Sequence, residues 1–303
     1  MASYFVLGIF TGLIYSMVAL GYTLVYGVLR LINFAHSEVL MTGGFAGYYF
    51  LHYTMKTTNV STGMRVLILV GAIVASGVAA AIIAVGIERF AYRPLRRRNA
   101  PKLTYLISAI GASYFLLTLA GKEFGHNPSA TAQPISSRAS WQVFGAQVTA
   151  FDVVLLIVTA VLFLAVNFLV TKSKVGRGIR AVASDAETAS LMGVNVNSTI
   201  ASTFAIGGFM GGVAGLFVAM SSQVDYNMGF TPALLAFTAA VLGGIGNIRG
   251  AMAGGVVLGI FMYVPIYWIH QPFYEPVIGF SILVLVLLVR PTGLFGESLG
   301  RSA

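Results

Sequence analysis

The polar segment at residues 171–196 carries residue types and spacings that suit binding to another protein. Ser184 and Glu187 are spaced as a capping box, in which a serine and a later glutamate satisfy free backbone N–H groups at a helix start. Gly193 is placed to adopt the left-handed conformation that ends a helix. The spacing therefore predicts a helix of about two turns, which is too short to be stable alone in water and needs a surface to lie against.

Two interpretations of this segment remain open on composition. In the first, the short helix presents a small apolar face among charges and docks on another protein at the cytoplasmic side. In the second, the segment is a solvated loop that only connects two membrane spans. On the docking interpretation, the residues expected to transmit the contact are Arg177, Arg180, Asp185, Ala186, Glu187, Ala189, Leu191 and Gly193.

A second polar cluster interrupts the apolar sequence at residues 31–38, and the later half repeats this design at residues 222–232. Short or interrupted apolar segments at corresponding places in two halves point to a pathway between inverted repeats. Ionisable residues at membrane depth are functional by default, whereas helix capping and interfacial anchoring are the alternative for Asn33, His36 and Glu38. The residues expected to line a pathway are Asn33, His36, Ser37, Glu38, Thr42, Thr231 and Thr238.

A glycine-rich run at residues 243–250 predicts a break or turn, because glycine weakens a helix. Its key positions are Gly243, Gly244 and Gly246, and the run lacks the lysine-serine or lysine-threonine of a phosphate loop. Gly259 lies inside an ordinary predicted span. We therefore expect valine at position 244 to cost far more assembly or transport than valine at position 259.

Several kinds of chemistry are excluded by what the sequence lacks. The chain has no cysteine, no P-loop motif, no metalloprotease or serine-hydrolase motif, and four histidines that are far apart in sequence. We expect no catalytic residue, cofactor or metal site in this chain. Most of its acids lie at span ends or loops, which does not suit a proton or sodium relay. A passive channel, or a permease driven from outside itself, remains.

Composition indicates an all-α polytopic membrane protein. Hydrophobic residues make up 57% of the 303 residues and charged residues 9%, with a mean hydropathy of +0.87, and no polar stretch is long enough for a separate soluble domain. We expect one transmembrane domain over residues 1–303, a helical bundle with a possible inverted repeat. The eight or nine expected spans, some short or broken, lie near 4–29, 37–52, 66–88, 103–120, 151–170, 198–220, 233–247, 250–269 and 276–289.

The distribution of basic residues predicts the topology. Residues 89–102 and 171–196 are strongly basic, whereas residues 121–152 have balanced charge, so the basic loops are expected inside and residues 121–152 outside. Arg249, Arg290 and Arg301 then place the C-terminus in the cytoplasm, and nine crossings place the N-terminus outside. The net charge of +9 is thus mainly a topology signal, and nucleic acid is not an expected partner because the basic residues flank spans without interleaved aromatics.

Four sequence blocks resemble the permeases of branched-chain amino-acid ABC transporters, and the first, LivH-like permease subunit fits best. The blocks, in family order, are GYTLVYG at 21–27 with INFAHSE at 32–38, YRPLRRRNAPKLTYLISAIGASYF at 92–115, GRGIRAVASDAETASLMGVN at 176–195 and FTAAVLGGIGNIRGAMAGG at 237–255. Ser37 stands where this family commonly has glycine, and Asn247 and Arg249 replace its usual serine and proline. The loop at 122–150 has no matching family wording.

The resemblance implies an importer subunit of the bacterial cytoplasmic (inner) membrane. Its partners would be a second permease subunit, two ATPase subunits that hold ATP and Mg²⁺, and an external solute-binding protein, and residues 185–192 would be the helix that couples to the ATPase. Branched-chain or related amino acids are the implied substrates, with urea, short amides or aromatic acids as alternatives. A self-sufficient channel or secondary carrier is the rival class.

Overall fold

The computed structural model describes residues 1–55, 61–134, 140–143, 145–290 and 292–295. Within these residues six helices are long and apolar enough to cross a membrane: α1 (Ala2–Leu29), α3 (Thr62–Ile87), α5 (Lys102–Phe124), α6 (Ala150–Lys172), α9 (Val196–Ser221) and α11 (Ile248–Ile269). Three shorter helices lie among them: α2 (His36–Thr54), α10 (Phe230–Gly243) and α12 (Glu275–Val289). These nine helices match the nine expected segments, and the all-α polytopic prediction is confirmed.

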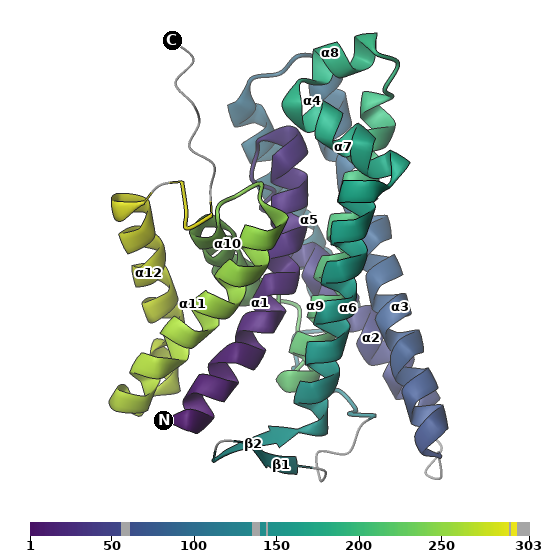
Figure 1. Cartoon of the computed structure of the whole chain (residues 1–303). Coiled ribbons are helices and arrows are strands. Elements are labelled where there is room, and N and C mark those ends of the chain that lie inside the picture. The colour runs from purple at the N-terminus through teal and green to yellow at the C-terminus, as the bar shows by residue number, and fades with distance from the viewer. Residues whose placement is uncertain (56–60, 135–139, 144, 291, 296–303) are drawn as a thin grey trace.

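The remaining elements lie at the two ends of the bundle (Figure 1). At one end are the π-helical turn η1 (Glu88–Tyr92), α4 (Arg93–Arg97), α7 (Lys174–Ser184) and α8 (Ala186–Leu191). At the other end is the hairpin of β1 (Ser140–Val143) and β2 (Ala146–Thr149), whose antiparallel register pairs Trp141 with Val148. The 3-10 turn η2 (Pro272–Tyr274) joins α11 to α12.

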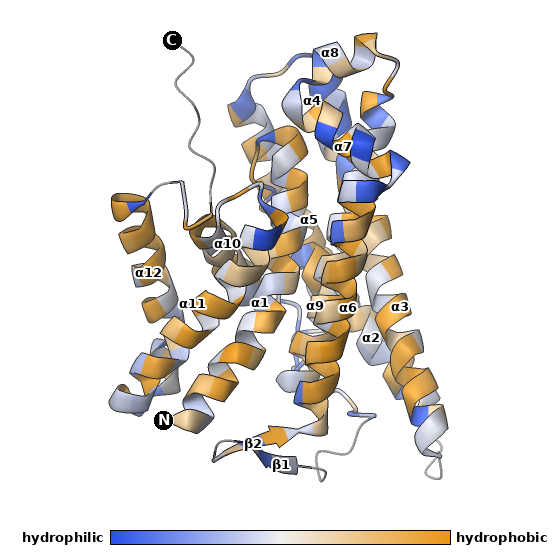
Figure 2. Ribbon diagram, in the orientation of Figure 1, coloured by the Kyte–Doolittle hydropathy of each residue, from blue (hydrophilic) through white to orange (hydrophobic). Residues whose placement is uncertain are grey.

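Figure 2 shows an apolar middle band and a polar end that carries α4, α7 and α8. The polar end contains the two basic segments at residues 89–102 and 171–196, so it faces the cytoplasm by the positive-inside rule. The N-terminus lies at the opposite end, beside the hairpin, and the described chain ends toward the polar side (Figure 1). This arrangement agrees with the expected topology, although Arg301 lies outside the described residues.

Two sets of helices pack on each other with the pattern of an inverted repeat. In the first set α1, α2, α3 and α5 follow one another, and in the second α9, α10, α11 and α12 do so. The helix that opens each set packs on the third helix of the other, as α1 does on α11 and α9 on α3. In the same way α2 packs on α9 and α10 packs on α1. The expected inverted repeat is thus visible in the contacts.

The turns that open the two short helices α2 and α10 give the repeat a residue register. Asn33 follows the end of α1 at Leu29 by the same interval at which Asp225 follows the end of α9 at Ser221. Each side-chain oxygen accepts the backbone N–H two residues on, over 3.1 Å for Asn33 and 2.6 Å for Asp225. Each carbonyl also accepts the N–H three residues on. The two halves therefore align at Ile32-Asn33-Phe34 and Val224-Asp225-Tyr226.

The two turns lie toward opposite ends of the bundle, as an inverted repeat requires. The turn at residues 30–35 follows the cytoplasmic end of α1, and the turn at 222–229 follows the outer end of α9. Val224 in the outer turn forms a two-way backbone bridge with Ser129 of the α5–α6 loop, with both N···O distances at 2.9 Å. The ring of His126 in the same loop contacts that of Tyr226, with centroids 4.8 Å apart.

Small residues let α1 and α11 approach to backbone contact. Gly8 and Gly12 on α1 face Gly259 and Gly255 on α11, and the Ser16 hydroxyl donates to the Met252 carbonyl over 2.8 Å. A Cβ on Gly259 would overlap the Gly8 carbonyl oxygen. The expectation that Gly259 tolerates a larger side chain is therefore wrong. Sequence position inside a span does not reveal that a second backbone lies against it.

This contact predicts that even alanine is damaging at position 259. Gly259→Ala should lower the melting temperature and folded yield of the purified protein, because α1 and α11 must separate to admit a methyl group. Gly111→Ala on α5 is the matched control, since a Cβ there meets nothing within 4 Å among the described residues, and alanine favours a helix by about 1 kcal/mol over glycine. Equal melting temperatures for the two variants in fluorescence-detected thermal unfolding would contradict the predicted close contact.

Candidate functional site

The cytoplasmic segment between α6 and α9 consists of two helices, α7 and α8, of which only α8 was expected. Ser173 caps α7 by accepting the Gly176 N–H over 3.0 Å. Ile179 and Val182 are buried beneath α7 together with Gly176. Gly176 lies directly on the end of α6, where any Cβ would overlap the carbonyls of Leu169 and Val170. α7 is thus fixed on the end of α6 and forms a base for α8.

The two arginines expected to dock on a partner are both exposed on α7, but they differ in their contacts. The Arg180 guanidinium donates to the Val170 carbonyl at the end of α6, where a cation also suits the helix dipole. A third arginine, Arg30 at the end of α1, donates to the Ala183 carbonyl over 3.4 Å. Arg180 therefore braces α7 on α6.

α8 begins one residue later than the capping-box pattern predicted. Ser184 is the last residue of α7, and Asp185 is the N-cap, so the prediction of a Ser184–Glu187 capping box is wrong. The Asp185 carboxylate accepts the N–H groups of Glu187 over 2.8 Å and Thr188 over 2.9 Å. The Thr188 N–H, followed by that of Glu187, lowers the pKa of the Asp185 carboxyl below its usual value. The serine was misassigned because α7 extends through it.

α8 ends as the sequence predicted, at a left-handed glycine. Gly193 has φ +83°, and its N–H donates to the Ser190 carbonyl over 3.0 Å. The Val194 N–H donates to the Ala189 carbonyl over 3.0 Å, which completes a Schellman motif. Ala189 is the buried residue of α8, packed in the same cluster as Val194. Both ends of this short helix are thus fixed by hydrogen bonds to the chain itself.

The outward face of α8 is exposed and apolar at one end. Leu191 and Met192 are 83% and 80% exposed, and Ala186 and Glu187 are also exposed. Large apolar side chains held at the tip of a rigid short helix are a suitable surface for another protein. Of the eight residues expected to couple, Ala186, Glu187 and Leu191 are exposed on α8, and Arg177 is exposed on α7. Asp185, Gly193 and Arg180 are also exposed but cap, end or brace the helices, and Ala189 is buried.

The polar residues after α1 are gathered in a buried cluster at the start of α2. Asn33 accepts the Tyr92 hydroxyl over 3.1 Å. The Ser37 hydroxyl donates to the Glu38 carboxylate over 2.7 Å. The Asn33, His36, Ser37 and Glu38 side chains are all 5% exposed or less. The structure therefore brings these four pathway candidates together, in a closed arrangement.

His36 occupies a space made by glycines on two neighbouring helices. Its ring contacts Tyr22 at a centroid distance of 4.5 Å. A Cβ on Gly21 of α1 would lie 2.7 Å from its Nε2 atom, and one on Gly211 of α9 would lie 3.2 Å from it. Among the described residues no hydrogen-bond partner reaches Nε2. The imidazole thus lies beside the point where the α1 and α9 backbones meet, since a Cβ on Gly21 would also lie 2.8 Å from the Gly207 carbonyl oxygen.

The three threonine candidates differ in exposure. Thr238 is fully buried on α10, and its hydroxyl donates to the Leu234 carbonyl over 3.1 Å. Thr42 is half-buried on α2, and Thr231 is exposed at the start of α10. α10 and the turn at 30–35 also border a small apolar pocket, which is lined by Tyr22, Tyr26, Ile32, Phe237, Ala240 and Ile245.

The predicted glycine break is confirmed as a tight turn between α10 and α11. Gly244 and Gly246 have φ +96° and +100°, a conformation that favours glycine. Gly243 contacts the Gly250 backbone so closely that a Cβ would overlap the Gly250 carbonyl. Asn247 caps α11 by accepting the N–H groups of Arg249 and Gly250. The turn is on the cytoplasmic side, and Arg249 is exposed there.

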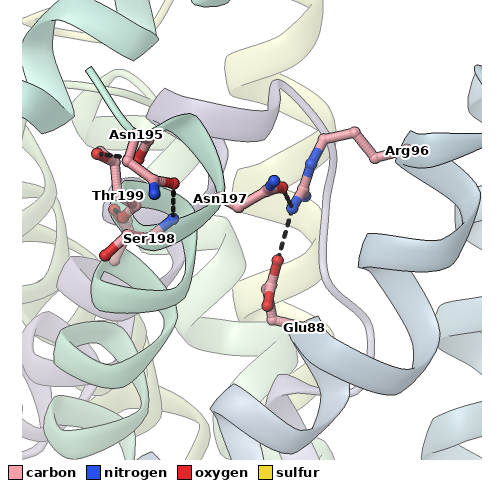
Figure 3. Close-up of polar contacts among 7 residues, drawn as sticks. Glu88, Arg96, Asn195, Asn197, Ser198 and Thr199 are labelled. Atoms are coloured by element: carbon pink, nitrogen blue, oxygen red, sulfur yellow. Dashed lines mark hydrogen bonds and ion pairs between the residues drawn. The ribbon is translucent and has the colours of Figure 1, made fainter. Parts of the chain in front are cut away.

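Sequence reasoning missed an ion pair beside α8. The Arg96 Nη2 atom donates to Glu88 over 2.7 Å and to the Asn197 side chain over 2.8 Å, and Figure 3 shows the guanidinium between these two residues. The Glu88 side chain is 1% exposed. The signal was present, because Glu88 is an acid directly before a run of basic residues. Within the described chain, no three His, Asp or Glu side chains gather as a metal site requires.

Comparison with known proteins identifies close relatives. The family described as branched-chain amino acid transport system, permease component, matches residues 4–289. The permease protein LivH of the high-affinity branched-chain amino acid transport system of Escherichia coli is 39% identical over 96% of this chain and 94% of its own length. BraD of Pseudomonas aeruginosa, from a system of the same name, is 36% identical over the same shares. The xylose permease protein XylH of Escherichia coli is 28% identical over 54% of this chain and 48% of its own.

The Asp185 cap predicts how acid affects α8. Since its folded pKa is lowered, the cap stabilises α8 fully above the ordinary carboxyl pKa, and this stabilisation is lost as pH falls below about 4. Hydrogen exchange of the Glu187 and Thr188 amides, corrected for intrinsic rates, should therefore show protection that declines in that range. Asp185→Asn should retain a cap without the pH dependence, and Asp185→Ala should lose protection at all pH values. Unchanged protection in Asp185→Ala would show that the cap does not hold α8.

Burial predicts an order of chemical access along the pathway candidates. In this naturally cysteine-free chain, single cysteines at Thr231 and then Thr42 should react fastest with small aqueous reagents. Cysteines at Ser37, Glu38 and Thr238 should be protected in the resting complex and become reactive in an ATP-trapped one. Protection of all five in both states would place the pathway elsewhere.

Proposed function

We propose, since this chain belongs to the family of permease components of branched-chain amino acid transport systems, that it is the permease subunit of an ATP-driven importer. It forms part of the pathway by which branched-chain or related amino acids cross the cytoplasmic membrane. The chain itself carries no nucleotide-binding motif. ATP and Mg²⁺ are bound by partner ATPase subunits, and this subunit performs no catalysis of its own.

The observation that carries the proposal is the exposed, doubly capped helix α8. A cytoplasmic connector has no physical need for a rigid helix with Leu191 and Met192 in solvent. A helix pushed by a partner needs both rigidity and an outward apolar face. The Asp185 cap and the Gly193 Schellman motif supply the rigidity, and α7 supplies the base. Two ATPase subunits complete the cytoplasmic part of the transporter. Each of them receives one such helix from one of the two permease subunits.

The substrate class is supported by the relatives. The aromatic and aliphatic residues beside the turn at 30–35 enclose a space of only about 10 Å³, so they contact an aliphatic side chain only once the pathway opens. The buried polar cluster of Asn33, His36, Ser37 and Glu38 lies at the start of the neighbouring α2, where a few polar contacts can meet a zwitterionic end. An external solute-binding protein delivers the solute from the side that carries the hairpin.

Reconstitution of the complex tests this function. The permease is co-expressed with the second permease, the two ATPases and the solute-binding protein, and the complex is placed in proteoliposomes. ATP-dependent accumulation of labelled leucine, isoleucine or valine is expected. Preference for urea, a short amide or an aromatic acid would reassign the substrate. Accumulation by the permease without ATPase subunits would show a self-sufficient channel or secondary carrier.

Ala186→Trp on the outward side of α8 tests the coupling surface. The indole should prevent α8 from entering a groove of the ATPase, so ATP-dependent uptake is abolished while the permease stays inserted and folded. Thr171→Trp is the control, because Thr171 is exposed at the cytoplasmic end of α6 but outside α8. Normal uptake by Ala186→Trp, with its ATPase subunits still bound, would reduce α8 to a connector.

A further inference from the structure

Arg96, which is paired with Glu88, also joins two parts of the cytoplasmic end that are distant in sequence. Arg96 lies on α4, and its Nη2 atom uses its two N–H bonds on Glu88 of η1 and on Asn197 in the first turn of α9 (Figure 3). That first turn follows directly after the Schellman motif of α8 and is capped by Asn195, which accepts the Ser198 N–H over 3.0 Å. A displacement of α8 therefore moves the partner of Arg96.

The π-helical turn η1 carries this connection to the start of the pathway. Glu88 opens η1, and its carbonyl accepts the Arg93 N–H. Tyr92 closes the same turn, and its hydroxyl donates to Asn33 over 3.1 Å. Tyr92 and Asn33 are 1% and 3% exposed. One turn of backbone thus holds both the acid that binds Arg96 and the phenol that binds the turn at residues 30–35.

Stability alone does not explain why charges are placed here. Burying a carboxylate costs desolvation energy that its ion pair often only offsets, so a buried ion pair contributes little net stability. One nitrogen of the planar guanidinium, Nη2 of Arg96, holds two acceptors at once. π-helical turns are likewise rare in helices and frequent at functional sites. The buried ion pair, the shared arginine and the π-helical turn all lie between α8 and the turn at residues 30–35.

We propose that Glu88, Arg96, Asn197 and Tyr92 are positioning residues that make α8 and the turn at 30–35 move as one body. This inference rests on the proposed function, since it describes how a force applied to α8 reaches the pathway. The direct contact of Arg30 with the Ala183 carbonyl is longer, at 3.4 Å, and exposed. The buried route through η1 is the stiffer of the two connections.

The proposal is tested first by the ratio of solute taken up to ATP hydrolysed in the reconstituted complex. Asn197→Ala removes the contact of Arg96 with α9 and keeps the ion pair, and Tyr92→Phe removes only the hydroxyl that binds Asn33. Each should lower the ratio about threefold or more. The double variant should be no lower than the more severe single one, because both changes break one connection. The controls are Ser198→Ala on the same turn of α9 and Tyr105→Phe, whose ring neighbours Tyr92.

Several outcomes would overturn the proposal. The first is an unchanged ratio of solute taken up to ATP hydrolysed in both single variants. This holds even if their melting temperatures fall, because the contacts would then stabilise the fold without transmitting motion. Ratios that multiply in the double variant also overturn the proposal, because they show two independent effects.

A second measurement does not depend on the transported solute. Spin labels on single cysteines at Thr188 of α8 and Phe34 of the turn, both exposed, report the distance between the two parts in the full complex. The proposal requires one narrow distance distribution that is the same in nucleotide-free and ATP-trapped states, and a broader one in Asn197→Ala. A distance that changes between the states in the parent chain would refute it. If the complex takes up no amino acid, the assigned substrate fails while this measurement still decides the positioning role.

Discussion

Contact between helix backbones without intervening side chains is the constraint on which the rest of this fold depends. In lipid, helices gain little from burying apolar surface against each other, so packing must come from close approach. α9 meets α3 and α2 at Gly212, where a Cβ would overlap Ala80 and Ser76 on α3. A Cβ on Gly43 of α2 would in turn overlap Gly212 itself. The two central helices, α1 and α9, are both fixed by such contacts, α1 through Gly8 and Gly12 and α9 through Gly212.

The same packing explains how polar turns are tolerated at the cytoplasmic and outer sides of the membrane domain. Irregular backbone is stable at such depths only where protein surrounds it. The turn at 30–35 satisfies its groups through Asn33 and Tyr92, and the turn at 222–229 does so through Asp225 and the bridge between Val224 and Ser129. Because the halves are inverted, one turn is tied to the cytoplasmic segments and the other to the outer loop.

Much of the architecture could be predicted from sequence because it depends on local rules. Apolar length and loop charge gave the nine helices and their direction, and glycine gave the turns at Gly244 and Gly193. The sequence also indicated that residues 31–38 and 222–232 correspond, although the register at Asn33 and Asp225 appeared only from the hydrogen bonds.

The predictions failed where a distant backbone decides the outcome. Ser184 resembles an N-cap, yet α7 continues through it because Ile179 and Val182 are buried against the bundle. Gly259 has no local feature that marks its contact with Gly8, and Arg180 has none that marks the Val170 carbonyl. The link from Arg96 to Asn197 spans about a third of the chain, so residue spacing could not reveal it.

α2 has a consequence for the biogenesis of this protein. It carries His36 and Glu38 and, although it is long enough, it is not apolar enough for a self-sufficient span. The helix that packs on its His36 side, α9, emerges from the ribosome only after α3, α5, α6, α7 and α8. We therefore expect nascent α2 to wait in a protected environment, at the insertion machinery or the membrane interface, until α9 arrives. During synthesis there is then an interval in which α2, the future pathway helix, is the least stably inserted part of the membrane domain.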